Sequence, residues 1–266
     1  MKNHSLKNKT VFITGASSGI GKACAQQFAE QGAHLVITAR RKDRLIKLAE
    51  ELTTKHEIKC LPLELDVRNQ KQVKELFQEL QKQEVDIDIL INNAGLALSS
   101  DKFQEAKVSN WDIMIDTNIK GILYLINETL PLMISKNQGH IVNIGSVAGH
   151  GYYIGGNVYC ATKHAVRALS HSLRLDLMGT AIRVSEVDPG CVHTEFSEVR
   201  WKDKARSDKF YEGFAPLVAD DIADAVLYCV TRPPHVNVAE MVVYPQAQAS
   251  LSELYRKGCD AKDLFT

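Results

Sequence analysis

Short runs of apolar, mostly β-branched residues alternate along the chain with longer segments whose apolar positions recur at helical spacing. The short runs predict seven strands, at residues 10–14, 34–38, 58–65, 87–91, 140–144, 183–187 and 241–243. The longer segments predict helices at about 19–31, 44–56, 70–81, 109–134 and 157–178. Pro131 lies near the end of the fourth helix and is expected to kink or shorten it. Because nearly continuous apolar strands are typical of a parallel sheet buried on both faces, the alternation predicts a Rossmann-type α/β fold.

The pattern gives no sign of a second domain. No repeat and no linker rich in Pro, Ser or Gly divides the sequence, so residues 1–266 are predicted to form one doubly wound sandwich. Residues 191–211 fit neither period and are expected to cover the substrate at the carboxyl edge of the sheet. The tail, residues 245–266, has mixed polarity, and the sequence leaves open whether it forms a subunit contact or shields the pocket.

Composition narrows the class of protein further. Lys plus Arg balance Asp plus Glu at 32 each, so no overall charge attracts the chain to nucleic acid or to an anionic membrane. The sequence has no run of eighteen apolar residues and no signal-type segment, which predicts a cytoplasmic protein. The six cysteines form no C-x-x-C pair, so neither a bound metal nor a disulfide framework is expected.

A glycine-rich turn follows the first predicted strand, in the run Thr14-Gly15-Ala16-Ser17-Ser18-Gly19-Ile20-Gly21. Its G-x-x-x-G-x-G spacing differs from the G-x-G-x-x-G dinucleotide fingerprint, but its place between a strand and a helix is the same. Glycines let the backbone turn tightly and approach a pyrophosphate, while free N–H groups at the helix start face the anion. The loop therefore predicts a nucleotide site made by Gly15, Ser17, Ser18, Gly19, Ile20 and Gly21.

The residues after the second predicted strand indicate which nucleotide binds. An NAD site needs an acid here, about 20 residues beyond the glycines, to bind the ribose 2′-hydroxyl. This chain instead has Arg40, Arg41 and Lys42, with no acid before Asp43. Arginines can hold a 2′-phosphate through charge-assisted hydrogen bonds, whereas basic residues at a helix N-terminus otherwise oppose the helix dipole. The pattern favours NADP(H), with Arg40 and Arg41 as the selecting residues.

Tyr159 and Lys163 supply the candidate chemistry. Residues at i and i+4 project from one face of a helix, so the two side chains are expected to meet. A lysine beside a phenol lowers the pKa of the phenol, which can then exchange a proton with an alcohol near neutral pH. Such a pair occurs often by chance on half-solvated helices, so its meaning depends on Ser146, thirteen positions upstream, and on the other motifs.

Taken together, the motifs resemble those of the short-chain dehydrogenase/reductase family, from about residue 9 to residue 245. The likeness rests, in order along the chain, on Thr14-Gly15-x-x-x-Gly19-x-Gly21, Asp66-Val67, Asn92-Asn93-Ala94-Gly95, Asn118, Ser146, Tyr159-x-x-x-Lys163 and Pro189-Gly190-x-x-x-Thr194. Each motif is weak alone, and the ordered set is specific. No residue that such enzymes use for chemistry is replaced in this chain.

The resemblance implies a role for each catalytic residue. Tyr159 would be the acid/base, Ser146 would donate a hydrogen bond to the substrate oxygen, and Lys163 would hold the nicotinamide ribose and lower the pKa of Tyr159. Asn118 would hold a water that connects Lys163 to solvent. The other implied cofactor contacts, to the adenine, the cofactor backbone and the carboxamide, come from Asp66, Val67, Asn93, Ala94, Gly95, Pro189, Gly190, Val192 and Thr194.

Several local stretches resemble the NADP-dependent 3-hydroxy acid dehydrogenase subgroup, at residues 92–98, 116–121, 155–159, 194–200 and 234–237. The implied reaction oxidises a small 3-hydroxy acid, such as serine, allo-threonine or 3-hydroxypropionate, or reduces the matching semialdehyde. A carboxylate substrate needs a cation in the pocket, and Arg200 is the candidate. An exposed arginine on a mobile loop is the equal alternative.

Two other functions stay open at this point. One is another reductase of the family, such as an enzyme acting on 3-oxoacyl thioesters, and the other is a non-catalytic NADP(H)-sensing protein. The resemblance also implies a homo-oligomer, a dimer or a tetramer, formed through the two long helices. A small-molecule substrate is the other partner expected.

Overall fold

The centre of the molecule is a sheet of seven parallel strands in the order β3-β2-β1-β4-β5-β6-β7. The computed structural model describes residues 5–257 of the chain. The strands are β1 (Thr10–Thr14), β2 (His34–Ala39), β3 (Cys60–Glu64), β4 (Ile89–Asn92), β5 (Gly139–Ile144), β6 (Ile182–Pro189) and β7 (Glu240–Val243). The predicted doubly wound Rossmann-type fold is confirmed.

Helices alternate with these strands along the chain. The α-helices are α1 (Gly19–Glu30), α2 (Lys42–His56), α3 (Gln70–Lys82), α4 (Val108–Ile115), α5 (Gly121–Ser135), α6 (Asn157–Asp176), α7 (Glu195–Trp201), α8 (Lys204–Phe210) and α9 (Ala219–Val230). Three short turns complete the set: η1 (Phe103–Glu105), a π-helical turn η2 (Asp116–Lys120) and η3 (Val147–Gly149). Within residues 5–257, no helix combines the length and apolar character that crossing a bilayer requires.

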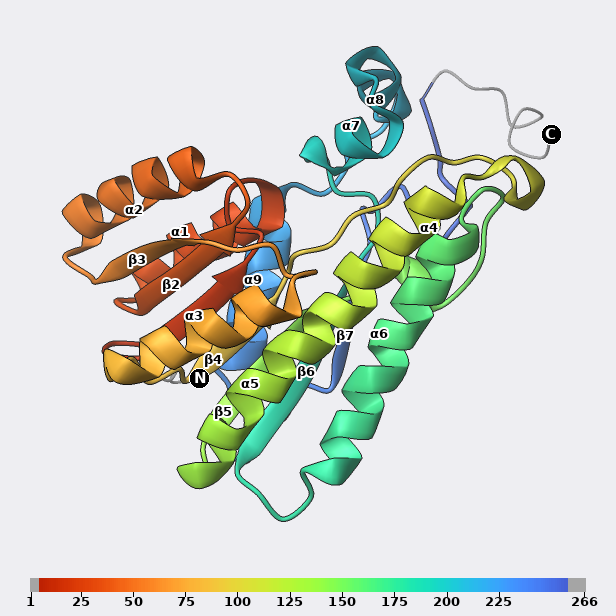
Figure 1. Ribbon diagram of the computed structural model, residues 1–266. Coiled ribbons are helices and arrows are strands. Elements are labelled where there is room, and N and C mark those ends of the chain that lie inside the picture. The colour runs from red at the N-terminus through yellow and green to blue at the C-terminus, as the bar shows by residue number, and fades with distance from the viewer. Residues whose placement is uncertain (1–4, 258–266) are drawn as a thin grey trace.

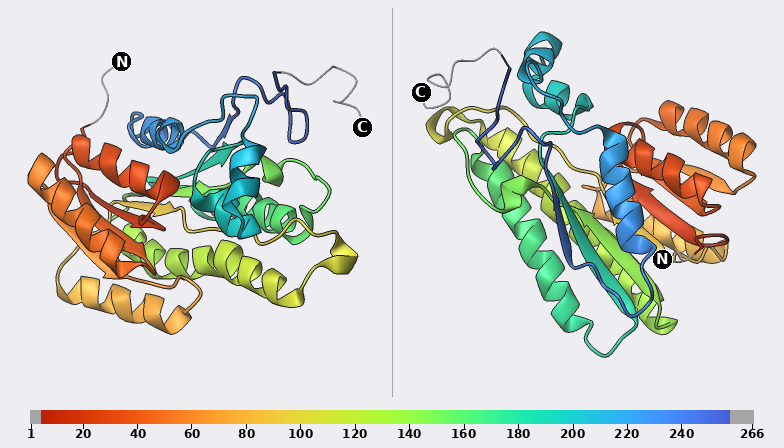
Figure 2. Two further views of the ribbon diagram at one scale, coloured as in Figure 1. Left: turned by 90° about the horizontal axis from the view of Figure 1, so that it is seen from above. Right: turned by 180° about the vertical axis from the view of Figure 1, so that it is seen from behind.

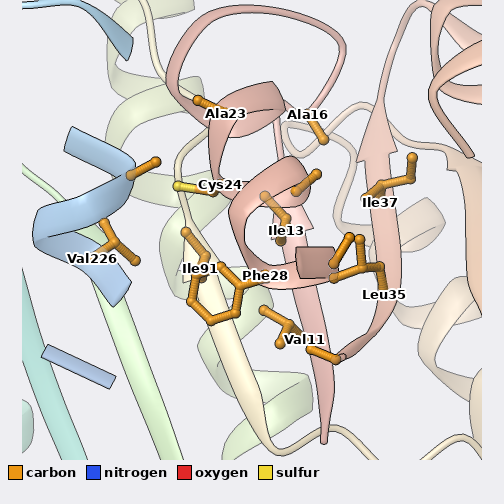
Figure 3. Packing of buried hydrophobic residues seen from close by; sticks show 14 of the residues in the cluster. Val11, Ile13, Ala16, Ala23, Cys24, Phe28, Leu35, Ile37, Ile91 and Val226 are labelled. Atoms are coloured by element: carbon orange, nitrogen blue, oxygen red, sulfur yellow. The ribbon is translucent and has the colours of Figure 1, made fainter. Parts of the chain in front are cut away.

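The helices cover both faces of the sheet, and each face has its own core (Figures 1 and 2). One core lies under α1, α2 and α9, and the other under α3 and α5. Side chains of β1 alternate between them: Val11 and Ile13 point to the first core, which Figure 3 shows, and Phe12 points to the second. In the second core Phe12 stacks on Phe77, with ring centroids 5.3 Å apart.

The chain order reverses at β1, which pairs with β2 on one side and with β4 on the other. In sheets of this kind, ligand sites lie outside the carboxyl ends of the strands at such a reversal. The helices α7 and α8 stand over this edge (Figure 1). The sequence expected residues 191–211 to cover the edge, and the structure adds that they form two short helices.

The helix expected at residues 109–134 is not continuous, so that prediction was wrong in detail. α4 ends at Ile115, the π-helical turn η2 follows, and α5 continues to Ser135. The turn carries Asn118, whose side-chain oxygen accepts a hydrogen bond from the backbone N–H of Leu96 at 2.9 Å. Pro131 does not end α5, which continues for four residues beyond it to Ser135.

The sequence interpretation missed α9 altogether. Its signal was present: Ile222, Val226 and Val230 recur every four residues and are buried against α1. Asp221 also caps the helix start by accepting a hydrogen bond from the backbone N–H of Val218 at 2.8 Å.

Candidate active site

A cleft of about 1230 Å³ opens at the carboxyl edge of the sheet. It is lined by the β1–α1 turn, the ends of the central strands, the start of α6, the helix α7 and residues 247–256 of the tail. Of the site residues expected from the sequence, only Gly21 and Asn118 do not line this cleft. The described part of the tail therefore shields the pocket, while residues 258–266 lie outside the described residues.

The glycine loop turns the backbone without side chains in the way. Gly15 and Gly19 have φ of +68° and +53°, a region that L-residues with a Cβ rarely adopt. Gly21 has a packing role instead, since a Cβ there would overlap the amide of Asn93 and the carbonyl of Gly15. That amide donates to the carbonyl of Thr14 at 2.7 Å and so ties β4 to the loop. The result is a backbone cradle open to the cleft.

Arg41 closes the far end of the cradle. Its guanidinium donates to the hydroxyl oxygen of Ser18 at 2.7 Å and to that of Ser17 at 3.0 and 3.1 Å. Its remaining terminal nitrogen donates to Glu195, on α7, at 2.7 Å. Arg40 is exposed at the rim of the same cleft. The two arginines are therefore not equivalent, because Arg41 alone is fixed against the glycine loop.

Asp66, expected beside an adenine, lies at the cleft wall with Val67. Its carboxylate accepts from the guanidinium of Arg68 at 2.6 Å. This hydrogen bond lowers the pKa of Asp66 and outweighs the opposing effect of partial burial. The acid is thus held ionised, and its orientation is fixed.

The three catalytic candidates converge where β5 ends. Ser146 follows that strand, and its hydroxyl lies within hydrogen-bond reach of Tyr159. The Lys163 ammonium lies 6.0 Å from the centroid of the Tyr159 ring and donates to the carbonyl of Ile144 at 2.9 Å. All three side chains border the cleft that the glycine loop opens. Tyr159 and Lys163 thus lie on one helix face at the expected i, i+4 spacing, and the ammonium bonds to the carbonyl of Ile144.

The sequence predicted a lowered pKa for Tyr159, and that prediction was wrong. Burial, reinforced by the neighbouring Tyr153, raises the pKa of Tyr159, and the hydrogen bond with Ser146 only partly offsets this. Lys163 does not approach the phenol more closely because its ammonium is turned to the carbonyl of Ile144. Burial also lowers the pKa of Lys163 to about 8, against the pull of the carboxyl groups of Glu186 and Asp188.

Asn118 acts as a brace behind these residues. Its amide nitrogen donates to the carbonyl of Leu96 at 2.8 Å and to the hydroxyl of Thr162 at 3.0 Å. Gly95 lies next to this brace, since a Cβ there would make ordinary contacts with the Asn118 oxygen at 3.4 Å and the Lys163 nitrogen at 3.7 Å. The π-helical turn thus ties the segment after β4 to the helix that carries the catalytic pair.

Arg200, the substrate candidate, points into the pocket from α7. Its guanidinium carbon lies 5.3 Å from the centroid of the Tyr153 ring and 5.9 Å from that of Tyr159. Its Nε donates to the carbonyl of Ser99 at 3.0 Å, and its guanidinium is also within hydrogen-bond reach of the Tyr153 hydroxyl, so both contacts fix the side chain. The alternative of an exposed arginine is contradicted, because the residue is half-buried and lines the cleft.

Three further residues of the site escaped the sequence interpretation. Glu195 pairs with Arg41 and also with Arg44, at 2.7 Å in each case. Gln248, from the tail, is buried, and its side-chain oxygen accepts from the backbone N–H of Cys191 at 2.9 Å. Tyr211 donates its hydroxyl to the carbonyl of Val192 at 2.7 Å. No local pattern marks these residues, since each acts on a segment far away in the sequence.

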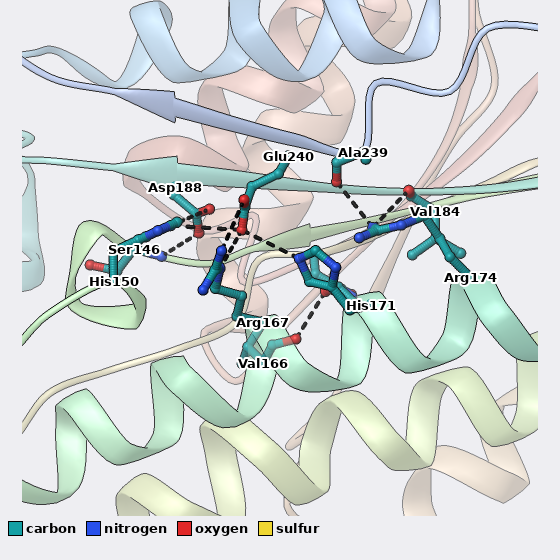
Figure 4. Close-up of polar contacts among 12 residues, drawn as sticks. Ser146, His150, Val166, Arg167, His171, Arg174, Val184, Asp188, Ala239 and Glu240 are labelled. Carbon is teal, nitrogen blue, oxygen red and sulfur yellow. Dashed lines mark hydrogen bonds and ion pairs between the residues drawn. The ribbon is translucent and has the colours of Figure 1, made fainter.

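A partly buried network of charged groups lies on the α6 side of β6 (Figure 4). Asp188 accepts from the backbone N–H of Ser146 at 2.9 Å and contacts the Nε2 of His150 at 3.0 Å. Glu240, on β7, accepts from Arg167 at 2.6 Å. His150, Asp188 and Glu240 place their polar atoms within 4.8 Å of one another, but the guanidinium of Arg167 already neutralises Glu240. We assign no metal to this group.

Residues 9–205 match the family model described as short chain dehydrogenase. The chain belongs to the short-chain dehydrogenase family. It is 43% identical over 254 residues to an NADP-dependent 3-hydroxy acid dehydrogenase of Schizosaccharomyces pombe, covering 95% of this chain and 98% of the relative. It is 44% identical over 241 residues to a sulfoacetaldehyde reductase of Chromohalobacter salexigens, covering 90% and 95% of the two chains.

The fold also matches a solved structure of a serine dehydrogenase, described as the closed form complexed with NADP⁺. The TM-score is 0.86 at 42% sequence identity, over 94% of this chain and 98% of the other. The match extends well beyond residue 205, so it includes the end of the cleft wall that the family model leaves out.

Proposed function

We propose that this short-chain dehydrogenase is an NADP(H)-linked oxidoreductase that interconverts a small 3-hydroxy acid and its oxo form. One observation carries the proposal: Ser146, Tyr159 and Lys163 converge in the same cleft as the Arg41 fork and the glycine loop. The relatives named above act on small hydroxy acids or on a small sulfonated aldehyde, according to their names. In both substrate types one carbon separates an anionic group from the reacting carbon.

The cradle fits the phosphorylated dinucleotide. The glycine loop offers backbone N–H groups at the start of α1, where a pyrophosphate is favoured. Arg41, Ser17 and Ser18 form a cluster of donors suited to a 2′-phosphate, and the second strand ends in no acid that would bind a free ribose hydroxyl. Bound NADP(H) would supply the hydride chemistry.

The protein's own groups manage the proton and the substrate oxygen. In oxidation Tyr159 accepts the proton of the substrate hydroxyl, and in reduction it returns one. Ser146 donates a hydrogen bond to the oxygen on which charge develops. Burial raises the pKa of the Tyr159 phenol, so its neutral form is favoured in the absence of a nearby positive charge. The positive charge of Lys163 acts in the opposite direction and favours the phenolate.

Arg200 is proposed to hold the anionic group of the substrate. It lines the cleft with its guanidinium carbon 5.9 Å from the centroid of the Tyr159 ring, and a guanidinium can bind a carboxylate or sulfonate with two parallel hydrogen bonds. Such a clamp fixes the distance between the anionic group and the reacting hydroxyl. This geometry favours short 3-hydroxy acids over 3-oxoacyl thioesters, whose reacting end carries no carboxylate.

The proposal is tested by following reduced-nicotinamide absorbance with L-serine, L-allo-threonine and 3-hydroxypropionate, each with NADP and with NAD. Reduction of sulfoacetaldehyde and of a short 3-oxoacyl thioester with NADPH completes the panel. Turnover of the small anionic substrates with NADP alone is the expected result. Preferred turnover of thioesters, rising with acyl length, would instead favour the other reductase class.

Arg200→Ala tests the substrate clamp. Activity on 3-hydroxy acids is expected to fall about 10- to 100-fold, while activity on an uncharged short alcohol changes little. Arg206→Ala is the matched control, because Arg206 also lies against Trp201 but bonds to Ser100 at the surface. Equal losses on charged and uncharged substrates would remove Arg200 from the carboxylate site.

We propose a homo-oligomer as the working state. Apolar side chains remain exposed on α4, α5 and α6, namely Val108, Leu123, Ile134 and Leu175. An exposed apolar surface on long helices is suited to a twofold contact with a second copy. Light scattering of the purified protein distinguishes a monomer from a dimer or a tetramer, and fractionation of cells tests the cytoplasmic location expected from the sequence.

A further inference from the structure

Two acidic residues occupy an unusual position on β6. Ile182 and Val184 face the core under the second layer of helices, and the alternation of the strand points Glu186 and Asp188 to the same side. Glu186 is 1% exposed and Asp188 is fully buried. An apolar side chain would suit this face of an inner strand, so the two acids call for a physical reason.

The two carboxyl groups lie against each other. A Cβ on Gly145 would overlap one oxygen of each acid, so both oxygens border the same small volume, and the groups are within hydrogen-bond reach. Asp188 has donors, from the backbone N–H of Ser146 and from His150. Within residues 5–257, neither oxygen of Glu186 accepts a hydrogen bond of normal geometry. The nearby hydroxyl of Ser170 lowers the pKa of Glu186, but its one proton is already donated to the carbonyl of Val166 at 2.9 Å. A carboxyl in that position is satisfied only when it carries a proton and donates it to its neighbour.

Other charged groups surround the two acids. The partners that these groups already have indicate which cation the acids compensate. The titratable groups that face the pair are Lys163, Arg167 and His171 from α6, His150 after η3, and Glu240 and Tyr244 from β7 and its end. Arg167 bonds to Glu240, and His171 lies 3.6 Å from the same carboxylate. In the part of the chain that the structure describes, the only hydrogen-bond partner of Lys163 is the neutral carbonyl of Ile144.

We propose that Glu186 and Asp188 share one proton and that their single negative charge is the counter-ion of the catalytic Lys163. The pair is then a positioning device: it touches neither substrate nor cofactor, and it acts through the lysine. This inference rests on the proposed function, since it concerns the Tyr159–Lys163 pair.

The consequence for catalysis has a definite sign. Without a nearby negative charge, the buried ammonium loses its proton more readily, because burial already lowers the pKa of Lys163 to about 8. A neutral lysine stabilises the phenolate less, so Tyr159 would require a higher pH to act as a base. Two carboxylates in one site cannot both ionise at low cost, and burial together with the neighbouring acid raises the pKa of Glu186.

The test compares single amide variants with the double variant. Glu186→Gln and Asp188→Asn each leave one carboxylate, which keeps the charge, so the acid limb of kcat/KM for alcohol oxidation should stay near its original pH. Glu186→Gln/Asp188→Asn together remove the charge and should move that limb upward by about one pH unit. Glu240→Gln is the matched control, because it removes a carboxylate charge that is ion-paired with Arg167.

An acid limb unmoved in a folded double variant, or moved as far by either single variant, would overturn the inference. Infrared spectroscopy tests the shared proton even where the double variant does not fold. The protein at pH 7 should give the carbonyl band of a protonated carboxyl, and each single variant should lose it. A band that persists in both would refute sharing. Loss of all turnover in the unaltered protein would refute the proposed function and leave this infrared result standing.

Discussion

The two ends of the cleft use charge in opposite ways. At the cofactor end, Arg41, Arg44 and Glu195 form ion pairs whose side chains are each about 40% exposed. At the catalytic end, Lys163, Glu186 and Asp188 are almost completely buried. Water screens the first set, whereas the second set interacts through the protein interior, where an uncompensated charge is costly.

This difference separates recognition from chemistry. Exposed pairs exchange partners at little cost, so the Arg41 fork can release Glu195 and accept a phosphate, which is also negatively charged. Buried groups cannot exchange partners, and they respond by shifting their pKa values. Variants at the catalytic end should therefore change rates and pH profiles, and variants at the cofactor end should change the KM for the cofactor.

The largest effect is expected for Tyr159→Phe. Loss of the acid/base group should reduce turnover about 10²- to 10⁴-fold, while the ring still packs against Phe196 and NADPH binding is retained. Steady-state kinetics and fluorescence titration with NADPH measure the two quantities. Tyr153→Phe is the control, because Tyr153 lines the same cleft and its hydroxyl is within hydrogen-bond reach of Arg200, and it should lose far less. Turnover retained in Tyr159→Phe would favour a different proton donor, and NADPH binding without turnover in the unaltered protein would favour a sensor.

The next effect concerns stability rather than rate. The pKa of Lys163 is about 8 in the folded protein, below the value of about 10.4 for an unfolded lysine. Between these values the unfolded chain binds more protons, so this residue makes the free energy of unfolding rise with pH, by on the order of 3 kcal/mol.

Urea denaturation at pH 7.5 and at about pH 10 measures that slope. Lys163→Met should flatten it, since methionine has no proton to lose. Lys71→Met is the control at an exposed position and should leave the slope unchanged. A Lys163→Met protein with the original slope would mean that Lys163 is charged throughout this range. The claim that burial shifts the pKa values at the catalytic end would then be contradicted.

At the cofactor end, Arg41→Ala should raise the KM for NADP roughly 10- to 100-fold, the amount expected for lost hydrogen bonds to a charged group. The KM for NAD should change little, because NAD has no 2′-phosphate. Arg40→Ala serves as the comparison: this residue is exposed and is not fixed to the glycine loop, so its effect should be smaller. A larger effect for Arg40 would place the phosphate at the rim.

The parts of this site that the sequence predicted are those with local patterns. The glycine loop, the Tyr159 and Lys163 spacing and the strand alternation each involve neighbouring residues, and backbone geometry alone connects such patterns to structure. The seven strands and the doubly wound order followed from them. The arginine that follows β2 could also be predicted from the sequence, because its position along the chain is fixed relative to the glycines.

The parts that escaped depend on burial and on contacts across the fold. The raised pKa of Tyr159 reflects how completely the helix start is covered, which no spacing reveals. Glu195 meets Arg41 across 154 positions, and Gln248 meets the loop after β6 across 57. The break in the helix at Asn118 also follows from a tertiary bond, to Leu96, that overrides the helical period.

The smallest effect is expected for Glu195→Gln. The carboxylate of Glu195 accepts hydrogen bonds from Arg41 and Arg44. Partial burial acts to raise the pKa of Glu195, but the two guanidinium groups together outweigh it, so the pKa is lowered. A 2′-phosphate would compete for the same donors. Removing the acid should therefore lower the KM for NADP, but only a few-fold, because exposed ion pairs contribute about 0–1 kcal/mol.

The salt dependence of this KM identifies the cause. The advantage of Glu195→Gln over the unaltered protein should shrink at 0.5 M salt, where screening already weakens the competition. Glu198→Gln, on the exposed side of the same helix, removes an equal charge away from Arg41 and should have no such effect. A raised KM in Glu195→Gln would mean that the acid holds Arg41 in place for the phosphate, and the exposed pair would then be as fixed in its geometry as the buried one.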